Sequence, residues 1–173
     1  MKLMMKPLIA ALCLTVAGSA FAVQKDITVT ANVDATLDMT LSDGSALPKS
    51  VEMQYIPGNG LSPVNLMTKI WSNAPTGGDI RMRLVTDAQL INNTGPQANP
   101  IPLSVSWGGE ALSAGTETVL KTSDLFPNGA DAAKTGSVAK ELQIAQATKG
   151  VVETGMYQGV VSIYLAQDTG SAQ

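Results

Sequence analysis

The feature that most constrains the fold is an unbroken alternation of apolar and polar residues from Ile27 to Leu41. Apolar side chains occupy every second position, as in a β-strand with one face toward a core and one toward water. At about 3.3 Å per residue, this run would extend roughly 50 Å, more than twice the length of a usual strand. One small domain cannot cover such a strand. The sequence therefore predicts that part of the run pairs with another subunit.

A secretory signal precedes the alternating run. A basic start is followed by an apolar stretch from Pro7 to Val16 and by small residues that end in Ala20-Phe21-Ala22. The Ala-x-Ala pattern predicts cleavage between Ala22 and Val23. The apolar stretch is too short to span a membrane, and no later segment has the required length of about twenty residues. We therefore expect a secreted chain of 151 residues, the full 173 less the 22 of the signal.

The composition excludes several kinds of chemistry. The chain has no histidine, and its one cysteine, Cys13, lies in the predicted signal. Ala10-Ala11-Leu12 before Cys13 do not form a lipoprotein pattern, so we expect Cys13 to be removed. Disulfides, thiolate nucleophiles, histidine triads and Cys/His metal sites are then excluded. Loss of Lys2 and Lys6 changes the formal net charge from −3 to −5, which argues against a nucleic-acid partner.

Short apolar or alternating runs recur along the rest of the chain. Turn sequences such as Pro57-Gly58-Asn59-Gly60 and Pro127-Asn128-Gly129 separate them. No segment resembles a long amphipathic helix, and at most one helical turn is expected within 130–140. The pattern predicts a single all-β domain, a β-sandwich. The expected strands are Ile27–Val33, Thr36–Leu41, Val51–Ile56, Leu66–Ser72, Ile80–Val85, Ile101–Trp107, Thr116–Leu120, Val138–Ala145 and Met156–Ala166.

The closing run, Met156–Ala166, carries apolar residues on both of its faces. Such content is typical of a strand in the middle of a sheet, covered on both sides. Gly159 lacks a side chain within this run. Its position predicts the close approach of a backbone or of a large neighbour.

Four segments spread across the chain carry a resemblance to a known family. They are Val23–Asp34, Asp43–Pro48, Ser104–Gly109 and Tyr157–Ser162. In this order they resemble the major pilins of the class 5, or alpha, fimbriae, the group that contains colonization factor antigen I and the cable pili. The first segment, Val-Gln-Lys-Asp-Ile-Thr-Val-Thr-Ala-Asn-Val-Asp, is the most specific of the four.

The resemblance implies a particular fold and function. It implies an incomplete immunoglobulin-like sandwich that lacks its last strand and is completed by the N-terminal extension of a neighbouring subunit. Subunits would polymerise head to tail by donor-strand exchange into an adhesive fimbria. The implied partners are identical subunits, a periplasmic chaperone, an outer-membrane usher and a minor tip adhesin. The chain would pass through the periplasm to the outer surface of a Gram-negative bacterium, without a cofactor and without enzymatic activity.

On this basis the chain divides into a signal peptide (1–22), a donor-strand extension (23–34) and a pilin domain (35–173). The donor side chains expected to enter a neighbour's core are Ile27, Val29, Ala31 and Val33. The acceptor groove is expected between the closing strand and part of Thr36–Leu41, with the lining residues Leu37, Met39, Leu41, Tyr157, Val161, Ile163 and Leu165. After the Val-Asp pair, where the family has proline, this chain has Ala35. The junction between extension and domain is therefore expected to lack the restraint that a proline would impose.

The main alternative is a self-contained secreted β-sandwich that recognises host surface glycans. Its first strand would stay in its own domain and bend at its middle. Arg81 and Arg83 share a strand face and could bind anionic glycans, although a solvated outer face is the more ordinary interpretation. Trp107 could stack on a ligand, but Trp107-Gly108-Gly109 favours a core residue that ends a strand at a turn.

The acidic residues do not form a recognisable site. Asp124 and Asp131 flank Gly129, but their spacing does not match a calcium-binding loop. Asp34 and Asp38 could imitate the carboxylate pair of a glycosidase, yet nothing places them in a cleft, and we expect no catalysis. Asn92-Asn93-Thr94 fits a glycosylation pattern and is interpreted as loop sequence.

Overall fold

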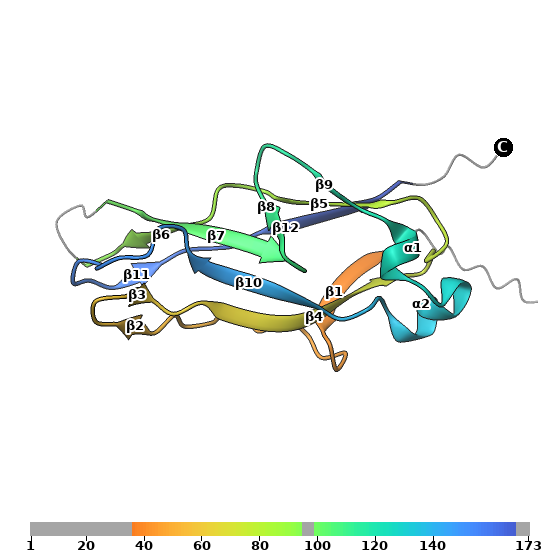
Figure 1. Cartoon of the computed structure of the whole chain (residues 1–173), viewed down its shortest axis with the longest axis horizontal. Coiled ribbons are helices and arrows are strands. Elements are labelled where there is room, and N and C mark those ends of the chain that lie inside the picture. Colours follow the sequence, from red (N-terminus) through yellow and green to blue (C-terminus); the bar gives the residue numbers. More distant parts are fainter. Residues whose placement is uncertain (1–35, 95–98, 169–173) are drawn as a thin grey trace, which may run out of the picture. The chain divides into compact units, whose positions relative to one another are not determined.

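The computed structural model describes residues 36–94 and 99–168 (Figure 1). All of them belong to one compact unit of the chain. Strands dominate this part, so the predicted all-β class is confirmed. The strands are β1 (Leu37–Leu41), β2 (Tyr55–Ile56), β3 (Gly60–Leu61), β4 (Val64–Ser72), β5 (Ile80–Leu84), β6 (Gln89–Asn92), β7 (Ile101–Trp107), β8 (Glu110–Leu112), β9 (Thr118–Leu120), β10 (Lys140–Gln146), β11 (Tyr157–Gln158) and β12 (Ile163–Gln167).

The strands form two main sheets. The larger sheet has the order β1-β4-β10-β7-β6-β11, with β8 paired to β7. The smaller sheet has the order β12-β5-β9, and β2 pairs with β3 as a separate hairpin. All of these pairs are antiparallel. In the described part of the chain, β1 and β12 therefore each stand at the end of a sheet.

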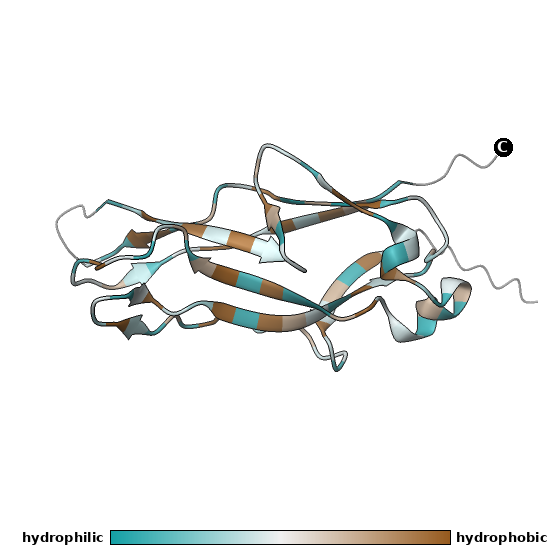
Figure 2. Cartoon of the chain, in the orientation of Figure 1, coloured by the Kyte–Doolittle hydropathy of each residue, from teal (hydrophilic) through white to brown (hydrophobic). Residues whose placement is uncertain are grey.

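The core lies between the inner faces of the two sheets. Apolar and polar residues alternate along β4 and β10 (Figure 2), so one face of each strand is buried. The smaller sheet contributes Ile80, Met82 and Leu84, and the outward positions between them are Arg81 and Arg83. Full burial of each large aliphatic side chain contributes about 1.5–3 kcal/mol. The larger sheet contributes Ile70, Val105, Trp107, Leu142 and Ile144 to the same cluster.

Trp107 is a core residue, as its position before two glycines predicted. It is 1% exposed, and its indole Nε1 donates a 2.8 Å hydrogen bond to Oγ1 of Thr68. Gly108 and Gly109 form the two-residue turn between β7 and β8, with φ values of +59° and +89°. Positive φ at both central residues is the geometry that matches the twist of a tight hairpin, and glycine adopts it without strain.

The predicted strand Val51–Ile56 is largely wrong. Only Tyr55 and Ile56 pair, with β3. The carbonyl oxygen of Gln54 accepts one more bond, from the Ser62 N–H, and 51–53 has no strand partner among the described residues. Apolar patterning indicates which side chains become buried, but a strand also needs a neighbouring backbone to bond with. The segment 51–54 instead forms part of the wall of a cavity.

The closing run is divided between the two sheets, so the prediction of one central strand is wrong. Tyr157 and Gln158 pair with β6 of the larger sheet, whereas Ile163–Gln167 pairs with β5 at the end of the smaller sheet. A Cβ atom on Gly159 would collide with the carbonyl oxygen of Gln89. The predicted close approach at Gly159 is therefore confirmed, and it occurs where the chain leaves one sheet for the other.

Short helical segments close one end of the core. They are α1 (Thr122–Leu125), the 3-10 turn η1 (Gly129–Asp131) and α2 (Ala132–Thr135). Sequence patterning indicated one turn in this region and missed α1. Leu125, Phe126 and Ala132 are buried against the core cluster. Across 36–94 and 99–168, no helix has the length and apolar content needed to cross a membrane.

Candidate functional site

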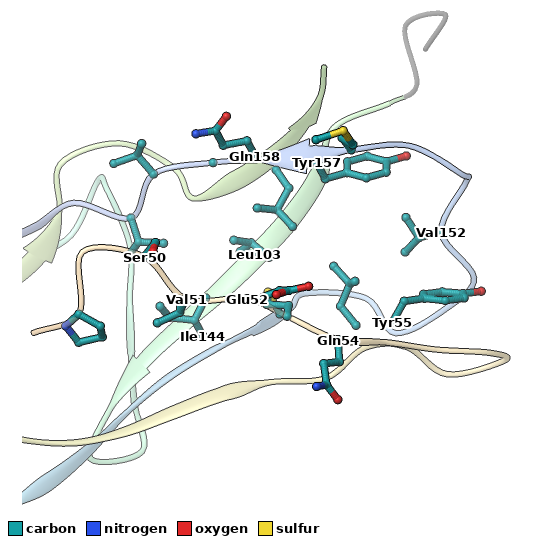
Figure 3. Close-up of a pocket in the computed structure, with 18 of the residues that line it drawn as sticks. Ser50, Val51, Glu52, Gln54, Tyr55, Leu103, Ile144, Val152, Tyr157 and Gln158 are labelled. Carbon is teal, nitrogen blue, oxygen red and sulfur yellow. The ribbon is translucent and has the colours of Figure 1, made fainter. Parts of the chain in front are cut away.

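An open cavity of about 1000 Å³ lies between the segment 47–55 and the segment 152–163. We call this cavity the apolar groove. Figure 3 shows its two walls, with Val51 and Tyr55 on one and Val152 and Tyr157 on the other. The segments that form the walls are far apart in sequence, so the groove exists only in the folded domain.

The floor of the groove consists of aliphatic side chains from the larger sheet. Leu103 of β7 and Ile144 of β10 lie between the two walls (Figure 3). Leu66 of β4, Leu90 of β6 and Leu142 of β10 complete this floor. Leu142 and Ile144 belong to the core cluster, and Leu66 and Leu103 pack against it, so the floor continues the core toward solvent. The groove is thus an opening into the hydrophobic core.

Large apolar side chains are also exposed at the rims. Val51 and Tyr55 on the first wall are 45% and 46% exposed, and Met156 and Val160 on the second are 70% and 73% exposed. Soluble monomers rarely leave a contiguous apolar surface of this kind open unless it binds something. An apolar occupant would remove both rims and floor from water.

One wall of the groove adjoins an edge strand. Ile163 lines the groove and is also the first residue of β12. β12 pairs with β5 on one side, and its other side has no strand partner among the described residues. A sheet edge offers main-chain N–H and C=O groups to an added strand. The site therefore combines an apolar floor with a strand edge.

The sequence located this site in part. Tyr157, Val161 and Ile163 line the groove. Of the other expected acceptor residues, Leu37, Met39 and Leu165 pack half-buried against the core, and Leu41 is half-buried in β1. The expected donor residues Ile27, Val29, Ala31 and Val33 lie outside the described residues, as do Ala22, Val23 and Ala35.

Sequence reasoning missed the floor residues and the wall formed by 47–55. The floor residues were visible as apolar positions of predicted strands, Leu103 and Ile144 among them. Their convergence was not visible, because they come from four strands whose pairing is a long-range property. The turn residues near Pro48 gave no signal that the following segment would border a cavity.

The arginines on the outer face of β5, Arg81 and Arg83, form ion pairs with acidic residues. Nη2 of Arg81 lies 3.0 Å from Asp168 and Nη1 lies 3.2 Å from Glu117. Hydrogen bonds to Asp168 and to Glu117 raise the pKa of Arg81. The guanidinium of Arg83 lies 4.6 Å from the ring centroid of Tyr164. This face is a mixed-charge surface, as the more ordinary interpretation expected, and not a basic patch.

The remaining acidic residues are dispersed. Asp131 lies 3.9 Å from the Lys134 ammonium, on the exposed surface of the helical end. Within 36–94 and 99–168, no three His, Cys, Asp or Glu side chains gather as a metal-ligand set. The apolar groove is therefore the candidate functional site.

Comparisons with known proteins agree on one family. Residues 23–166 match the CS1 type fimbrial major subunit. The CS1 fimbrial subunit of Escherichia coli is 38% identical over 154 residues, covering 87% of this chain and 88% of the relative. The CFA/I fimbrial subunit of Escherichia coli O78:H11 is 37% identical over 169 residues, covering 92% and 96%. The structure of the CooA pilin subunit from enterotoxigenic Escherichia coli is similar with a TM-score of 0.64 and 32% identity, covering 78% of this chain and 88% of that one.

Proposed function

The chain belongs to the family of CS1 type fimbrial major subunits, and from this premise we propose that each subunit inserts its residues 23–34 into the apolar groove of a neighbour. The chain serves as a structural pilin of an extracellular fimbria, which is built from copies of the same subunit. The proposed division of the chain is a signal peptide (1–22), a donor-strand extension (23–34) and a pilin domain (35–173).

The observation that carries the proposal is the match between the groove and the alternating run. The groove has an aliphatic floor beside the edge of β12. Residues 27–33 have an apolar side chain at every second position. A strand laid along that edge would direct Ile27, Val29, Ala31 and Val33 to the floor while its main chain bonds to β12. The proposed acceptor residues are Tyr157, Val161 and Ile163, together with the floor.

The energetics favour slow dissociation of the inserted strand over high equilibrium affinity. Burial of Ile27, Val29 and Val33 would contribute about 1.5–3 kcal/mol each. Each ladder hydrogen bond would add about 1 kcal/mol, whereas each ordered backbone residue costs about 1–2 kcal/mol. These opposing contributions are similar in size. Release of the strand would reopen the neighbour's core, so a high barrier to dissociation would maintain the filament.

The donor and the acceptor are different parts of one chain, so the contact between subunits is heterologous. Such head-to-tail contacts give open filaments when the rotation between subunits does not close a ring. The alternative, a self-contained glycan-binding sandwich, is not favoured, because the relatives are fimbrial subunits.

The proposed route to the surface follows from the same groove. An exposed apolar groove beside a free strand edge is prone to aggregation until it is filled. We therefore propose that a periplasmic chaperone covers the groove after export, that an outer-membrane usher directs strand exchange, and that a minor tip adhesin ends the filament.

A pair of variants tests the proposed function. Val29→Asp places a charge on the inserted face, and burial of an unpaired charge is costly. Thr28→Asp places the same charge on the opposite face of the strand. Negative-stain microscopy should show filaments, and gels of unheated samples should show ladders, for wild type and for Thr28→Asp. Both should be absent for Val29→Asp. Compact monomers for all three proteins would refute donor-strand assembly.

A further inference from the structure

The main chain of Thr36 is held by a single residue at the point where the chain enters β1. The first pair of the β1–β4 ladder is Leu37 with Ser72. One position further out, the backbone N–H of Asn73 donates to the carbonyl oxygen of Thr36 at 3.4 Å. The backbone N–H of Thr36 donates to the side-chain Oδ1 of Asn73 at 2.9 Å. Both main-chain polar groups of Thr36 are therefore bonded to Asn73.

The second of these bonds departs from a regular ladder. In an antiparallel pair of this type, the N–H of Thr36 would bond to the backbone carbonyl of Asn73. The side-chain amide of Asn73 takes the place of that carbonyl, since a short amide can mimic a backbone group. The ladder is thus extended by one residue, although the backbone of Asn73 already turns into the next loop.

That loop also anchors the end of β12. We call residues 72–78 the anchoring loop. The side chain of Gln167, the last residue of β12, donates to the carbonyl oxygens of Ala74 at 2.9 Å and Gly78 at 3.1 Å. Its Oε1 accepts a 2.7 Å hydrogen bond from the hydroxyl of Ser72. One loop therefore holds the start of β1 and the end of the edge strand β12.

We propose that Asn73 is a positioning residue that fixes the direction in which the N-terminal extension leaves the domain relative to the edge of β12. This inference rests on the proposed donor-strand assembly. The extension leads away from Thr36 to the next subunit, and β12 receives the strand of another. The geometry at the anchoring loop then sets the angle between successive subunits of the filament.

The sequence gives a reason for such a restraint. At residue 35 the chain has alanine, so no proline ring fixes φ at the junction. The two hydrogen bonds at Thr36 restrain the adjoining peptide groups instead. Thr36 and Asn73 are exposed, and hydrogen bonds between exposed groups replace bonds to water with little net gain. Loss of these bonds should therefore change filament geometry and leave the stability of the domain nearly unchanged.

The test compares filaments of wild type, Asn73→Ala and Asn73→Asp. Asn73→Ala removes the oxygen that accepts from Thr36, whereas Asn73→Asp keeps an oxygen there. Asn128→Ala, at an exposed asparagine of the helical end, is the matched control. Persistence length is measured by tracing stained filaments, and the subunit-to-subunit rotation is measured by electron cryomicroscopy. We expect a loss of persistence length and a broadened rotation for Asn73→Ala, a smaller change for Asn73→Asp, and wild-type values for Asn128→Ala.

A second substitution separates positioning from a general structural role. Ala35→Pro in the Asn73→Ala background should restore the persistence length, because it restrains the junction by another route. Melting temperatures of the subunits should agree within the series. Asn73→Ala filaments with wild-type persistence length and rotation would overturn the inference. Absence of filaments in the wild type would instead refute donor-strand assembly itself.

A measurement on wild-type filaments covers the case in which Asn73→Ala protein does not accumulate. The amide proton of Thr36 should exchange with deuterium more slowly than a free peptide amide, because it is bonded to Asn73. Slower exchange than in a free peptide is also expected in Asn73→Asp filaments, where an oxygen remains to accept from Thr36. Exchange of the Thr36 amide at the rate of a free peptide would overturn the inference.

Discussion

The indole Nε1 of Trp107 donates a 2.8 Å hydrogen bond to Oγ1 of Thr68 at the centre of the core. Thr68 is 0% exposed, and its hydroxyl donates in turn to the carbonyl oxygen of Lys140 at 3.1 Å. The three residues belong to β7, β4 and β10, the strands that also provide most of the groove floor. These hydrogen bonds join three neighbouring strands that contribute to the floor of the proposed acceptor site.

Thr68→Val should destabilise the domain by about 1–3 kcal/mol, because it leaves the buried indole N–H without its acceptor. The substitution preserves the size and shape of the side chain. Urea denaturation followed by tryptophan fluorescence measures the change. Thr68→Ser keeps the hydroxyl and should lose less stability than Thr68→Val. A Thr68→Val protein as stable as wild type would contradict the importance of this bond.

Gly159→Ala should disturb the second wall of the groove. Its Cβ atom would collide with the carbonyl oxygen of Gln89 and lie 3.1 Å from Cδ2 of Leu90, so we expect a loss of about 1–3 kcal/mol, typical of overpacking. Filament yield should fall as well, because β11 would move from β6. Gly115→Ala, where an added Cβ meets nothing within 4 Å, is the control. Equal stability and yield for the two variants would argue against the close approach.

Met156 should report whether the groove is filled. It is 70% exposed at the groove, Met67 is 49% exposed away from it, and Met82 is 0% exposed in the core. Hydrogen peroxide oxidises accessible thioethers to sulfoxides, so Met156 and Met67 should react ahead of Met82 in unassembled subunits. Assembly should slow the oxidation of Met156 but not of Met67, as measured by mass spectrometry. Unchanged oxidation of Met156 in filaments would mean that this rim stays uncovered.

The ion pair between Asp79 and Lys121 should make stability sensitive to acid. A 2.7 Å hydrogen bond from the Lys121 ammonium and a bond from the Thr122 N–H lower the pKa of Asp79 below its ordinary value of 3.8. Because the folded-state pKa is lowered, the stabilisation is present above 3.8 and is lost as the pH falls through the folded-state value.

Asp79→Asn should therefore lose less stability than wild type when the pH is lowered from neutral to below 3.8. Urea midpoints across this range measure the difference. Lys121→Met should reduce the acid dependence in the same direction, since it removes the main cause of the lowered pKa. Because the pair is exposed, the effect should weaken in high salt. Parallel pH profiles for wild type and Asp79→Asn would contradict this account.

Local patterning predicted the strands whose two faces differ in polarity. The strand Ile101–Trp107 has the predicted bounds, and Ile80–Leu84 is one residue shorter than predicted. Met82 is buried and Arg81 points outward, as alternation required. The turn after Trp107 was also predictable, because two adjacent glycines permit its backbone angles. Such features depend on neighbouring residues in the chain.

The sequence by itself determined the all-β class, the family resemblance and the alternating run proposed as donor. Tertiary structure alone decided that the closing run divides at Gly159 between two sheets. It also decided that Leu66, Leu103 and Ile144 meet as the floor of one groove, and that Asn73 reaches Thr36. Alternation specifies which side of a strand is apolar, but not which strand lies beside it. Strand pairing brings together residues that are far apart in the chain, and these contacts form the site.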